Sequence, residues 1–447
     1  MTTDRSPHVL RSARLWIGAG LLVAILSGVF ATLYVGGNLD PVGHLNNLPV
    51  ALVNDDSGAV VDGRAVNFGE QVVAGIQQAE RADHSFAWRA VNAAEARTLL
   101  GQGKVYGALE IPANFSAALR SLTSADGSPA VRPTIDVFTN QAAGSLGSSF
   151  ASTANQTAVH GASAAIGKQL LAAAERQGAH LNGATRLLLA DPVTISVASG
   201  HALGSHSGNG LTAFYYALVL IVVGMLAANV VISQVDTALG YLHADFGPIR
   251  QRNPLRHTSR AHTLLIGIVL MLGVSIVAGS LVELMAIGVL GMDASHLALL
   301  WVFSVSAIAV VGISALTLLA AFGTPGMLVL TVVFVALAIP SSGGTVPIQA
   351  LPGFFRWLAE FEPLRQVTGG VRSILYFNAQ GAAGLDRAWT AMAIALPVAL
   401  IWGFGVTHLY DRKGLHRVPK HVPDGMVVPP AGFEPATPGL GVRRSIP

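Results

Sequence analysis

The amino-acid sequence predicts an α-helical polytopic membrane protein, with one transmembrane helix before and five after an inserted extracytoplasmic α/β domain. Composition and patterning both point to this class. Of the 447 residues, 52% are hydrophobic and only 11% are charged, whereas ordinary soluble proteins carry about 25% charged residues. So few charges cannot cover a water-facing surface on a chain of this length, and much of the surface must therefore face lipid. The apolar residues are also gathered into stretches about as long as a membrane span.

Six apolar stretches define the predicted spans. A spanning helix needs about 20 residues, because the hydrocarbon core of a bilayer is about 30 Å thick. The stretches are residues 15–35, 211–232, 263–281, 297–321, 322–339 and 389–409. Gly323, Pro325 and Gly326 break the run between the fourth and the fifth, which predicts a tight helical hairpin there. Because the fifth stretch is short, five or seven spans remain alternatives to six.

The distribution of Lys and Arg predicts that both termini are cytoplasmic. With the N-terminus inside, the cytoplasmic pieces carry 13 of these residues and the short outside loops carry 4, as the positive-inside rule requires. Residues 1–14 are then a cytoplasmic N-terminus, 15–35 an uncleaved first span and 36–210 an extracytoplasmic segment. Residues 211–409 form a five-helix permease-like membrane domain. Residues 410–447 form a cytoplasmic tail, whose Pro- and Gly-rich end is predicted to be disordered.

Residues 36–210 carry the pattern of a folded α/β domain followed by a helical stalk. Residues 48–53 form a short apolar run that ends at a turn-forming segment, 54–58, which predicts a strand and a turn. Residues 105–111 and 134–138 are further predicted strands, and 113–122 a helix. From residue 141 to about 189 the chain is rich in Ala, Ser and Gly. This composition predicts one or two helices that lead as a stalk to the second span.

The sequence offers little catalytic chemistry, and the chain is predicted not to be an enzyme. The absence of cysteine excludes disulfides, thiol catalysis and cysteine-ligated metal. The nearest approach to a P-loop, residues 161–169, has five residues between its glycines and Gln169 where Ser or Thr must hold magnesium. Its alternative interpretation, a small-residue helix face, is favoured. The histidines lack ligand spacing, so no cofactor or metal is expected, and the basic residues flank spans instead of forming a nucleic-acid surface.

Two loops carry the candidate functional residues. The cytoplasmic loop 233–262 is long enough for a short helix at the membrane surface, and four arginines make it a candidate docking surface for a cytoplasmic partner: Arg250, Arg252, Arg256 and Arg260. The alternative is a loop that only obeys the positive-inside rule.

The outside loop 340–388 carries two amphipathic stretches that are predicted to lie in the membrane interface or to re-enter the outer leaflet. The first places aromatic and aliphatic side chains on one helical face beside a tryptophan: Phe354, Phe355, Leu358 and Phe361, with Trp357. The second, 364–377, places Val367, Val371 and Ile374 together, with Arg365 and Arg372 among its polar positions.

The order of these parts resembles the phage infection protein (YhgE/Pip) family of type 2 ABC-transporter permeases. Three phrases carry the resemblance, which covers roughly residues 10–412. They are Asn-Leu-Pro-Val-Ala-Leu-Val-Asn-Asp-Asp-Ser-Gly at 47–58, Gly-Lys-Val-Tyr-Gly-Ala-Leu-Glu-Ile-Pro-Ala-Asn-Phe-Ser at 103–116, and Leu-Pro-Gly-Phe-Phe-Arg-Trp-Leu at 351–358 with Gly-Val-Arg-Ser-Ile-Leu-Tyr at 370–376.

The resemblance implies an ABC-type exporter permease of the bacterial plasma membrane, in contact with lipid. Such a permease pairs as a homo- or heterodimer and is driven by a separate ATPase subunit, and its substrate is not implied. The alternative function is a membrane-anchored surface or scaffolding protein, such as a phage receptor or a secretion-associated protein, without transport activity.

Overall fold

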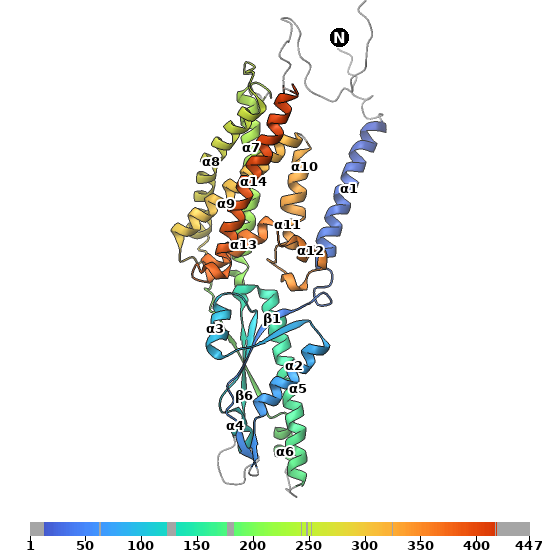
Figure 1. Cartoon of the computed structure of the whole chain (residues 1–447), viewed down its shortest axis with the longest axis vertical. Helices are drawn as coiled ribbons and strands as arrows, with labels where there is room; N and C mark the ends of the chain where they lie inside the picture. The colour runs from blue at the N-terminus through green and yellow to red at the C-terminus, as the bar shows by residue number, and fades with distance from the viewer. Residues whose placement is uncertain are drawn as a thin grey trace, which may run out of the picture.

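A computed structural model describes residues 13–61, 64–122, 131–176, 183–242, 244–246, 249–251, 253–323, 325–415 and 417. These residues form a bundle of apolar helices with an α/β domain at one end (Figure 1). We call the end of the bundle next to the α/β domain the domain end. We call the opposite end, where the first helix begins and the last one finishes, the terminal end. The tail predicted to be disordered, 418–447, lies outside the described residues.

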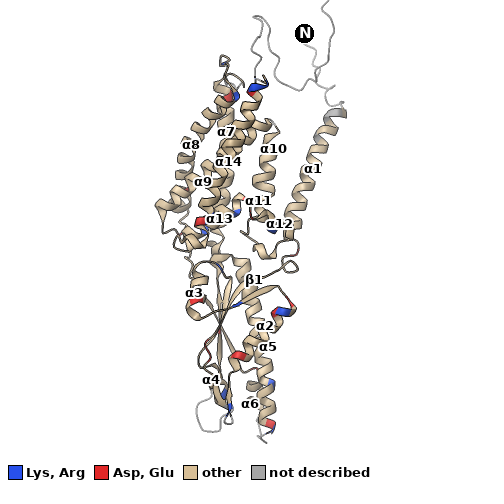
Figure 2. Ribbon diagram, viewed as in Figure 1, with Lys and Arg blue, Asp and Glu red and all other residues tan. Residues whose placement is uncertain are grey.

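Five helices of the described residues are long and apolar enough to cross a membrane. They are α1 (Ala13–Asn38), α7 (Thr212–Ala238), α8 (Arg260–Glu283), which a π turn at Leu284–Val289 continues, α9 (Leu297–Phe322) and α14 (Leu385–Arg412). Each coincides with a predicted span, and the chain is therefore a multi-pass membrane protein. Figure 2 shows acidic and basic residues near the ends of the bundle and on the α/β domain, while the middle of the helices is bare of them.

The sixth predicted span is a shorter apolar segment, Gly326–Ser341. It comprises α10 (Gly326–Thr331), a π turn at Val332–Ala336 and α11 (Ala338–Ser341). Sixteen residues at 1.5 Å each extend about 24 Å, which is less than a bilayer core of about 30 Å. The segment nevertheless runs from the terminal end toward the domain end beside α1 (Figure 1). Its status as a span stays a prediction.

The α/β domain is built on a five-stranded sheet in the order β4-β1-β5-β6-β7. Its strands are β1 (Leu48–Asn54), β4 (Phe86–Ala90), β5 (Gly107–Ile111), β6 (Thr134–Thr139) and β7 (Thr194–Ser199). β1 pairs in parallel with β4 and β5, β6 is antiparallel to β5, and β7 is parallel to β6. A small antiparallel pair, β2 (Ala59–Val61) with β3 (Arg64–Val66), stands apart from the sheet. The predicted strands at β1, β5 and β6 are confirmed.

Helices cover both faces of the sheet. α2 (Phe68–Ala82), α4 (Phe115–Ser121), α5 (Ser145–Arg176) and α6 (Gly183–Ala190) contribute to one apolar core with β1, β5 and β6. A smaller core joins α3 (Ala93–Gly101) to β1 and β5. The predicted helix at 113–122 is confirmed as α4. The sequence analysis did not predict α2, α3, β4 or β7 as separate elements, because none of them contains a continuous apolar run.

The predicted helical stalk is wrong in its placement. The small-residue segment does form two helices, but α5 lies along the sheet as part of the α/β domain, and strand β7 leads the chain back to the bundle (Figure 1). Small side chains explain the difference, because they let α5 approach the strands closely. Ala151 is fully buried, and Asn155 donates a side-chain hydrogen bond to the Ala108 carbonyl of β5 at 3.1 Å.

A buried carboxylate, Asp56, joins the carboxyl end of β1 to the first turns of two helices. Its Oδ1 accepts a hydrogen bond from the Ser116 amide of α4 at 2.9 Å. Its Oδ2 accepts from the Gly69 amide of α2 at 3.0 Å and from the Ser116 hydroxyl at 2.5 Å. A Cβ at Gly69 would lie 2.7 Å from the Asp56 Cβ, so only glycine fits there. The turn phrase at 54–58 therefore has a structural role.

The loop after α7 forms a small hairpin at the terminal end. β8 (Ala244–Phe246) pairs antiparallel with β9 (Ile249–Gln251), so the short surface helix expected within 233–262 is wrong. Two hydrogen bonds hold the loop to the end of α7: the Asn253 side-chain amide donates to the Thr237 carbonyl at 2.8 Å, and the Arg256 amide donates to the Leu239 carbonyl at 3.0 Å.

Candidate functional site at the junction of the α/β domain and the membrane helices

The first amphipathic stretch of the outside loop is α12 (Gly353–Leu358), whose aromatic side chains point two ways. Phe354, Trp357 and Phe361 are 54%, 61% and 70% exposed, and adjacent rings in this trio lie 6.4 and 5.6 Å apart. Phe355 is instead buried, with its ring close to Gly37 at the end of α1. Leu358 is half-buried. The single aromatic face expected from the sequence is therefore wrong, because the end of α1 covers one side of this short helix.

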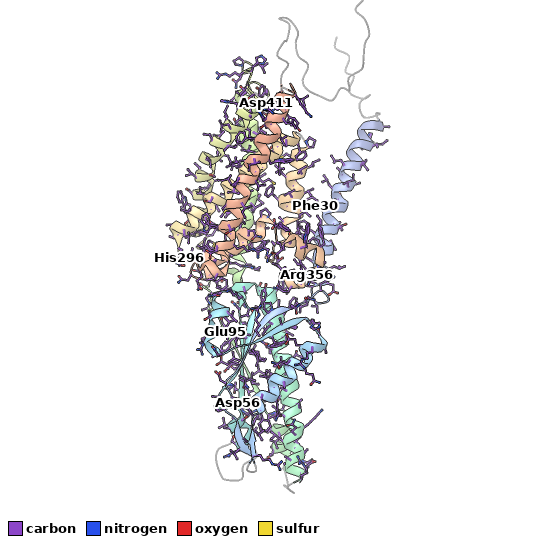
Figure 3. All side chains as sticks on the ribbon, viewed as in Figure 1. Phe30, Asp56, Glu95, His296, Arg356 and Asp411 are labelled. Carbon is purple, nitrogen blue, oxygen red and sulfur yellow. The ribbon has the colours of Figure 1, made fainter. Side chains whose placement is uncertain are left out.

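The exposed trio has the composition of a membrane-interface anchor. Figure 3 shows Arg356, on the same helix, at the domain end of the bundle, where α1 finishes. Aromatic side chains with a basic neighbour favour the boundary between acyl chains and water. The location of this segment in the membrane interface stays a prediction.

The second amphipathic stretch, α13 (Pro363–Tyr376), packs its apolar face into the bundle. Val367, Val371 and Ile374 share that face, as expected, and are at most 3% exposed. Gly370 gives α13 its close approach to α9 and α14, because a Cβ there would lie 2.6 Å from Phe303 Cε2 and 2.8 Å from Ala388 Cβ.

Ionisable side chains fix the start of α13. Glu362 caps the helix by accepting a hydrogen bond from the Arg365 amide at 2.8 Å. Arg365 in turn donates to the Ala359 carbonyl and forms an ion pair with Glu360 at 2.9 Å. Arg387 of α14 pairs with the other oxygen of Glu360 at 3.0 Å. Arg365 therefore joins α12 to α13, and Glu360 joins both to α14.

Arg372 lies at the contact between α13 and the α/β domain. Its Nη1 and Nη2 donate to the Gly343 and Gly344 carbonyls at 3.3 and 3.0 Å. Its Nε is fully enclosed and has no hydrogen-bond partner among the described residues. Burial lowers the pKa of Arg372, while the nearby Tyr106 of the α/β domain acts in the opposite direction. A guanidinium held by carbonyl oxygens can fix the position of the loop that follows α11.

The carboxyl end of α13 contacts the α/β domain and α7 together. His201 Nε2 donates to the Tyr376 carbonyl at 2.7 Å. The Tyr376 hydroxyl lies 2.5 Å from Thr212 Oγ1, in the first turn of α7. Gly103, with a φ of 63°, faces the Phe377 ring so closely that a Cβ would lie 2.7 Å from it. The residues that follow β7 and precede α7 are thus attached to α13, an arrangement that spacing in the sequence does not signal.

The candidate docking arginines have different surroundings at the terminal end. Arg260 Nε donates to the Leu415 carbonyl at 2.7 Å, and its guanidinium lies 5.2 Å from the centre of the Tyr410 ring. These contacts hold the Arg260 guanidinium against the end of α14. Arg256 is exposed. Arg252 lies outside the described residues, and at Arg250 only the backbone, in β9, is described.

An ion pair that the sequence did not single out closes the terminal end. Asp236 in the last turns of α7 pairs with Arg417, beyond α14, and the Arg417 guanidinium lies 5.8 Å from the centre of the Tyr241 ring. Asp411 of α14 accepts hydrogen bonds from the first amides of α8, including that of Arg260 at 3.0 Å, and lies at the terminal end in Figure 3. These contacts hold the ends of α7, α8 and α14 together.

The segment that approached a P-loop, residues 161–169, lies inside α5. Helical amides there donate within the helix and cannot cradle a phosphate. Gly167 instead faces the carbonyl groups at the end of α6. Within the described residues, no three His, Asp or Glu side chains gather where they could hold a metal ion.

Protonation of Glu362 is expected to make stability depend on pH. Burial raises the pKa of this carboxyl to about 8, and hydrogen bonds from the Leu364 and Arg365 amides offset only part of that. The folded protein then holds a proton that the unfolded chain, with a pKa near 4.3, has lost. The free energy of unfolding should fall as pH rises from about 5 to 8 and level off above that range.

Glu362→Gln, which mimics the neutral form, should flatten this part of the profile when thermal unfolding is followed between pH 5 and 9. Glu360→Gln is the matched control, because hydrogen bonding to Arg365 lowers the pKa of Glu360 and it titrates below this range. An unchanged slope in Glu362→Gln would contradict the assignment.

A bundle of membrane-length helices, closed at one end by an ion pair and hydrogen bonds and attached through α13 to an α/β domain at the other, defines a class of multi-pass membrane proteins with a large domain on one side. The family model described as "Protein of unknown function (DUF3533)" matches residues 19–395. The chain belongs to this family.

One solved structure is similar to part of the chain. It is the "domain of a putative ABC type-2 transporter" from Thermotoga maritima MSB8, at 16% sequence identity, and the similarity covers 38% of this chain and 98% of that one. The TM-score is 0.23, which is too low to support a conclusion about fold or function. Comparison with the curated proteins finds no significant match.

Proposed function

We propose that the chain is the membrane permease subunit of an ABC-type exporter, paired with a second permease and energised by a separate ATPase. The resemblance of its phrases to the YhgE/Pip family supports this. Its α1 leaves apolar surface for such a pairing, since it stands apart from the other long helices (Figure 1) and none of its most apolar 18 residues is buried within the chain. That apolar surface is available to lipid or to the partner permease.

The observation that carries the proposal is the continuity of α7 between the two ends of the bundle. At the domain end, Thr212 in its first turn bonds to Tyr376 of α13. At the terminal end, α7 leads into the β8–β9 hairpin and carries Asp236, which pairs with Arg417. A stiff helix fixed at both ends can convey a displacement imposed at the hairpin to α13 and the α/β domain. This is the mechanical link that a permease driven by an external ATPase requires.

The scaffolding alternative has one observation in its favour, the size of the α/β domain relative to the bundle. A receptor or secretion-associated protein needs only an anchor, however, and the bonds between α13, α7 and the α/β domain exceed what anchoring demands. The presence or absence of a stoichiometric ATPase distinguishes the two functions.

The proposed topology has six passes with both ends of the chain in the cytoplasm. α1 begins and α14 finishes at the same end of the bundle (Figure 1). An even number of passes is therefore needed, and Gly326–Ser341 supplies the sixth beside the five long helices.

Single cysteines test this topology without background, because the chain has none of its own. Ser57→Cys on the α/β domain and Ser295→Cys in the loop before α9 are both exposed and should react with a membrane-impermeant maleimide in intact cells. His257→Cys, exposed at the terminal end, should react only after the membrane is opened. Labelling of His257→Cys in intact cells would contradict this topology, because it would place the terminal end outside the cell.

Of the four candidate docking arginines, Arg256 is the one whose side chain is described and exposed. Arg256→Lys keeps the charge that orients the loop but removes the planar fork that binds carboxylates in two places. ATPase association should weaken by about 1–3 kcal/mol, or about fivefold to 150-fold, while membrane insertion stays normal. Arg89→Lys, on the exposed surface of the α/β domain, is the matched control. If quantitative co-purification finds that both variants retain the same amount of ATPase, Arg256 does not contact the ATPase.

A further inference from the structure

An open groove of about 670 Å³ lies on the α/β domain, and none of its lining residues belongs to α13. Its walls come from α2, the edge strand β4, α5 and the loop that follows α1. This volume is in the range of pockets that hold small organic molecules, about 300–1,000 Å³. None of the residues that line the groove is assigned above to ATPase docking, to the membrane interface or to helix capping.

The walls of the groove are mainly aromatic and aliphatic. Phe86 and Trp88 of β4, with ring centres 6.3 Å apart, line it together with Phe150 of α5. Val42 and Leu45, in the loop after α1, complete the apolar lining, and Val42 is 66% exposed. Apolar surface left open to solvent beside aromatic rings favours a ligand with an apolar body.

The charged groups of the lining are both acidic. Glu80 Oε1 accepts a hydrogen bond from the Trp88 amide at 3.2 Å, and Asp83 Oδ1 accepts from the amide and hydroxyl of Ser85. These bonds from Ser85 lower the pKa of Asp83, which is therefore ionised at neutral pH. Among the described residues, no Lys or Arg lines the groove. An anionic ligand would meet two carboxylates and no opposing positive charge in this lining.

We propose that this groove binds an amphipathic organic cation, with its apolar part against Trp88 and Phe150 and its positive group beside Glu80 and Asp83. Aromatic faces attract cations as well as apolar groups, so both parts of such a ligand find partners here. The groove begins at the loop that leaves α1, at the domain end of the membrane helices (Figure 1). A molecule dissolved in the membrane surface can therefore reach it directly. The proposal stands whether or not the chain is a permease.

Equilibrium binding of radiolabelled tetraphenylphosphonium to the full chain in zwitterionic lipid nanodiscs tests the proposal, with empty nanodiscs to subtract partitioning. We expect one site per chain, and weaker binding of the neutral analogue triphenylphosphine oxide. Glu80→Gln with Asp83→Asn keeps the acceptors for Trp88 and Ser85 but removes both charges, and should weaken cation binding about fivefold. The matched control is Glu70→Gln with Glu95→Gln, which removes two exposed carboxylates outside the groove and should leave binding unchanged.

Thr157→Trp, at an exposed α5 position in the groove wall, should block binding without disturbing the core. Binding no greater than in empty nanodiscs, or equal weakening by the two double variants, would overturn the proposal. Cross-linking that shows the groove covered by a second copy, with the probe excluded, would also overturn it. No ATPase is present in this measurement, so its failure would leave the permease proposal untouched.

Discussion

Asp56→Ala is expected to lower the free energy of unfolding of the α/β domain by about 3–5 kcal/mol. The carboxylate accepts hydrogen bonds from the amides of Gly69 and Ser116 and from the Ser116 hydroxyl. Its removal leaves these buried donors without an acceptor, and each such loss costs about 1–3 kcal/mol. Hydrogen exchange of the β1 and β5 amides should show protection reduced about a hundredfold or more, since 1.4 kcal/mol corresponds to a tenfold change.

The neighbouring Asp55 provides the matched control. It has the same charge and lies one residue earlier in the same turn, but its side chain is exposed. Asp55→Ala should therefore change protection by less than about threefold, as is usual for surface substitutions. Similar losses in both variants would mean that the charge of the turn matters, and would contradict the role assigned to the buried carboxylate.

Gly370→Ala is expected to destabilise the membrane bundle by about 1–3 kcal/mol, the usual range for overpacking. The added methyl group would overlap the Phe303 ring of α9 and the Ala388 side chain of α14. α13 would have to move away from both helices, which would also disturb its bonds to α7. Thermal unfolding of the purified protein in nanodiscs, followed by tryptophan fluorescence, should shift to lower temperature.

The adjacent glycine, Gly369, provides the matched control for Gly370. A Cβ at Gly369 would meet nothing closer than the Gly384 carbonyl at 3.9 Å, an ordinary contact. Gly369→Ala should therefore keep or slightly raise stability, because alanine favours a helix by about 1 kcal/mol over glycine. A loss at position 369 as large as at 370 would show that α13 does not pack as described.

The long helices were predictable because a bilayer requires a continuous apolar run, a signal that no tertiary contact can mask. β1 was predictable for a related reason, since it is a compact apolar run that ends at turn residues. The stalk was misjudged because a small-residue helix has the same sequence pattern whether it stands alone or packs on a sheet. Asn155 and its bond to Ala108 decide between the two, and they join segments 47 positions apart.

The candidate site was only partly predictable. The apolar face of α13 follows from its helical period, and Val367 and Val371 lie where that period places them. Phe355 of α12 is buried and its other aromatic side chains are exposed because α1 ends beside Phe355. The local sequence of α12 does not contain this information. The bonds between Tyr376 and Thr212 and between Asp236 and Arg417 join segments 164 and 181 positions apart. Such pairs arise from packing and leave no trace in spacing.

The dependence on a separate ATPase is the central claim, and gentle purification from native membranes tests it most directly. The complex should be extracted into nanodiscs, its subunits quantified by mass spectrometry and its ATP hydrolysis measured before and after the co-purifying proteins are removed. The account predicts an ATPase in stoichiometric amount, with hydrolysis that disappears when that subunit is removed. A stoichiometric cell-wall or secretion component without an ATPase, or hydrolysis that persists in the chain alone, would contradict it.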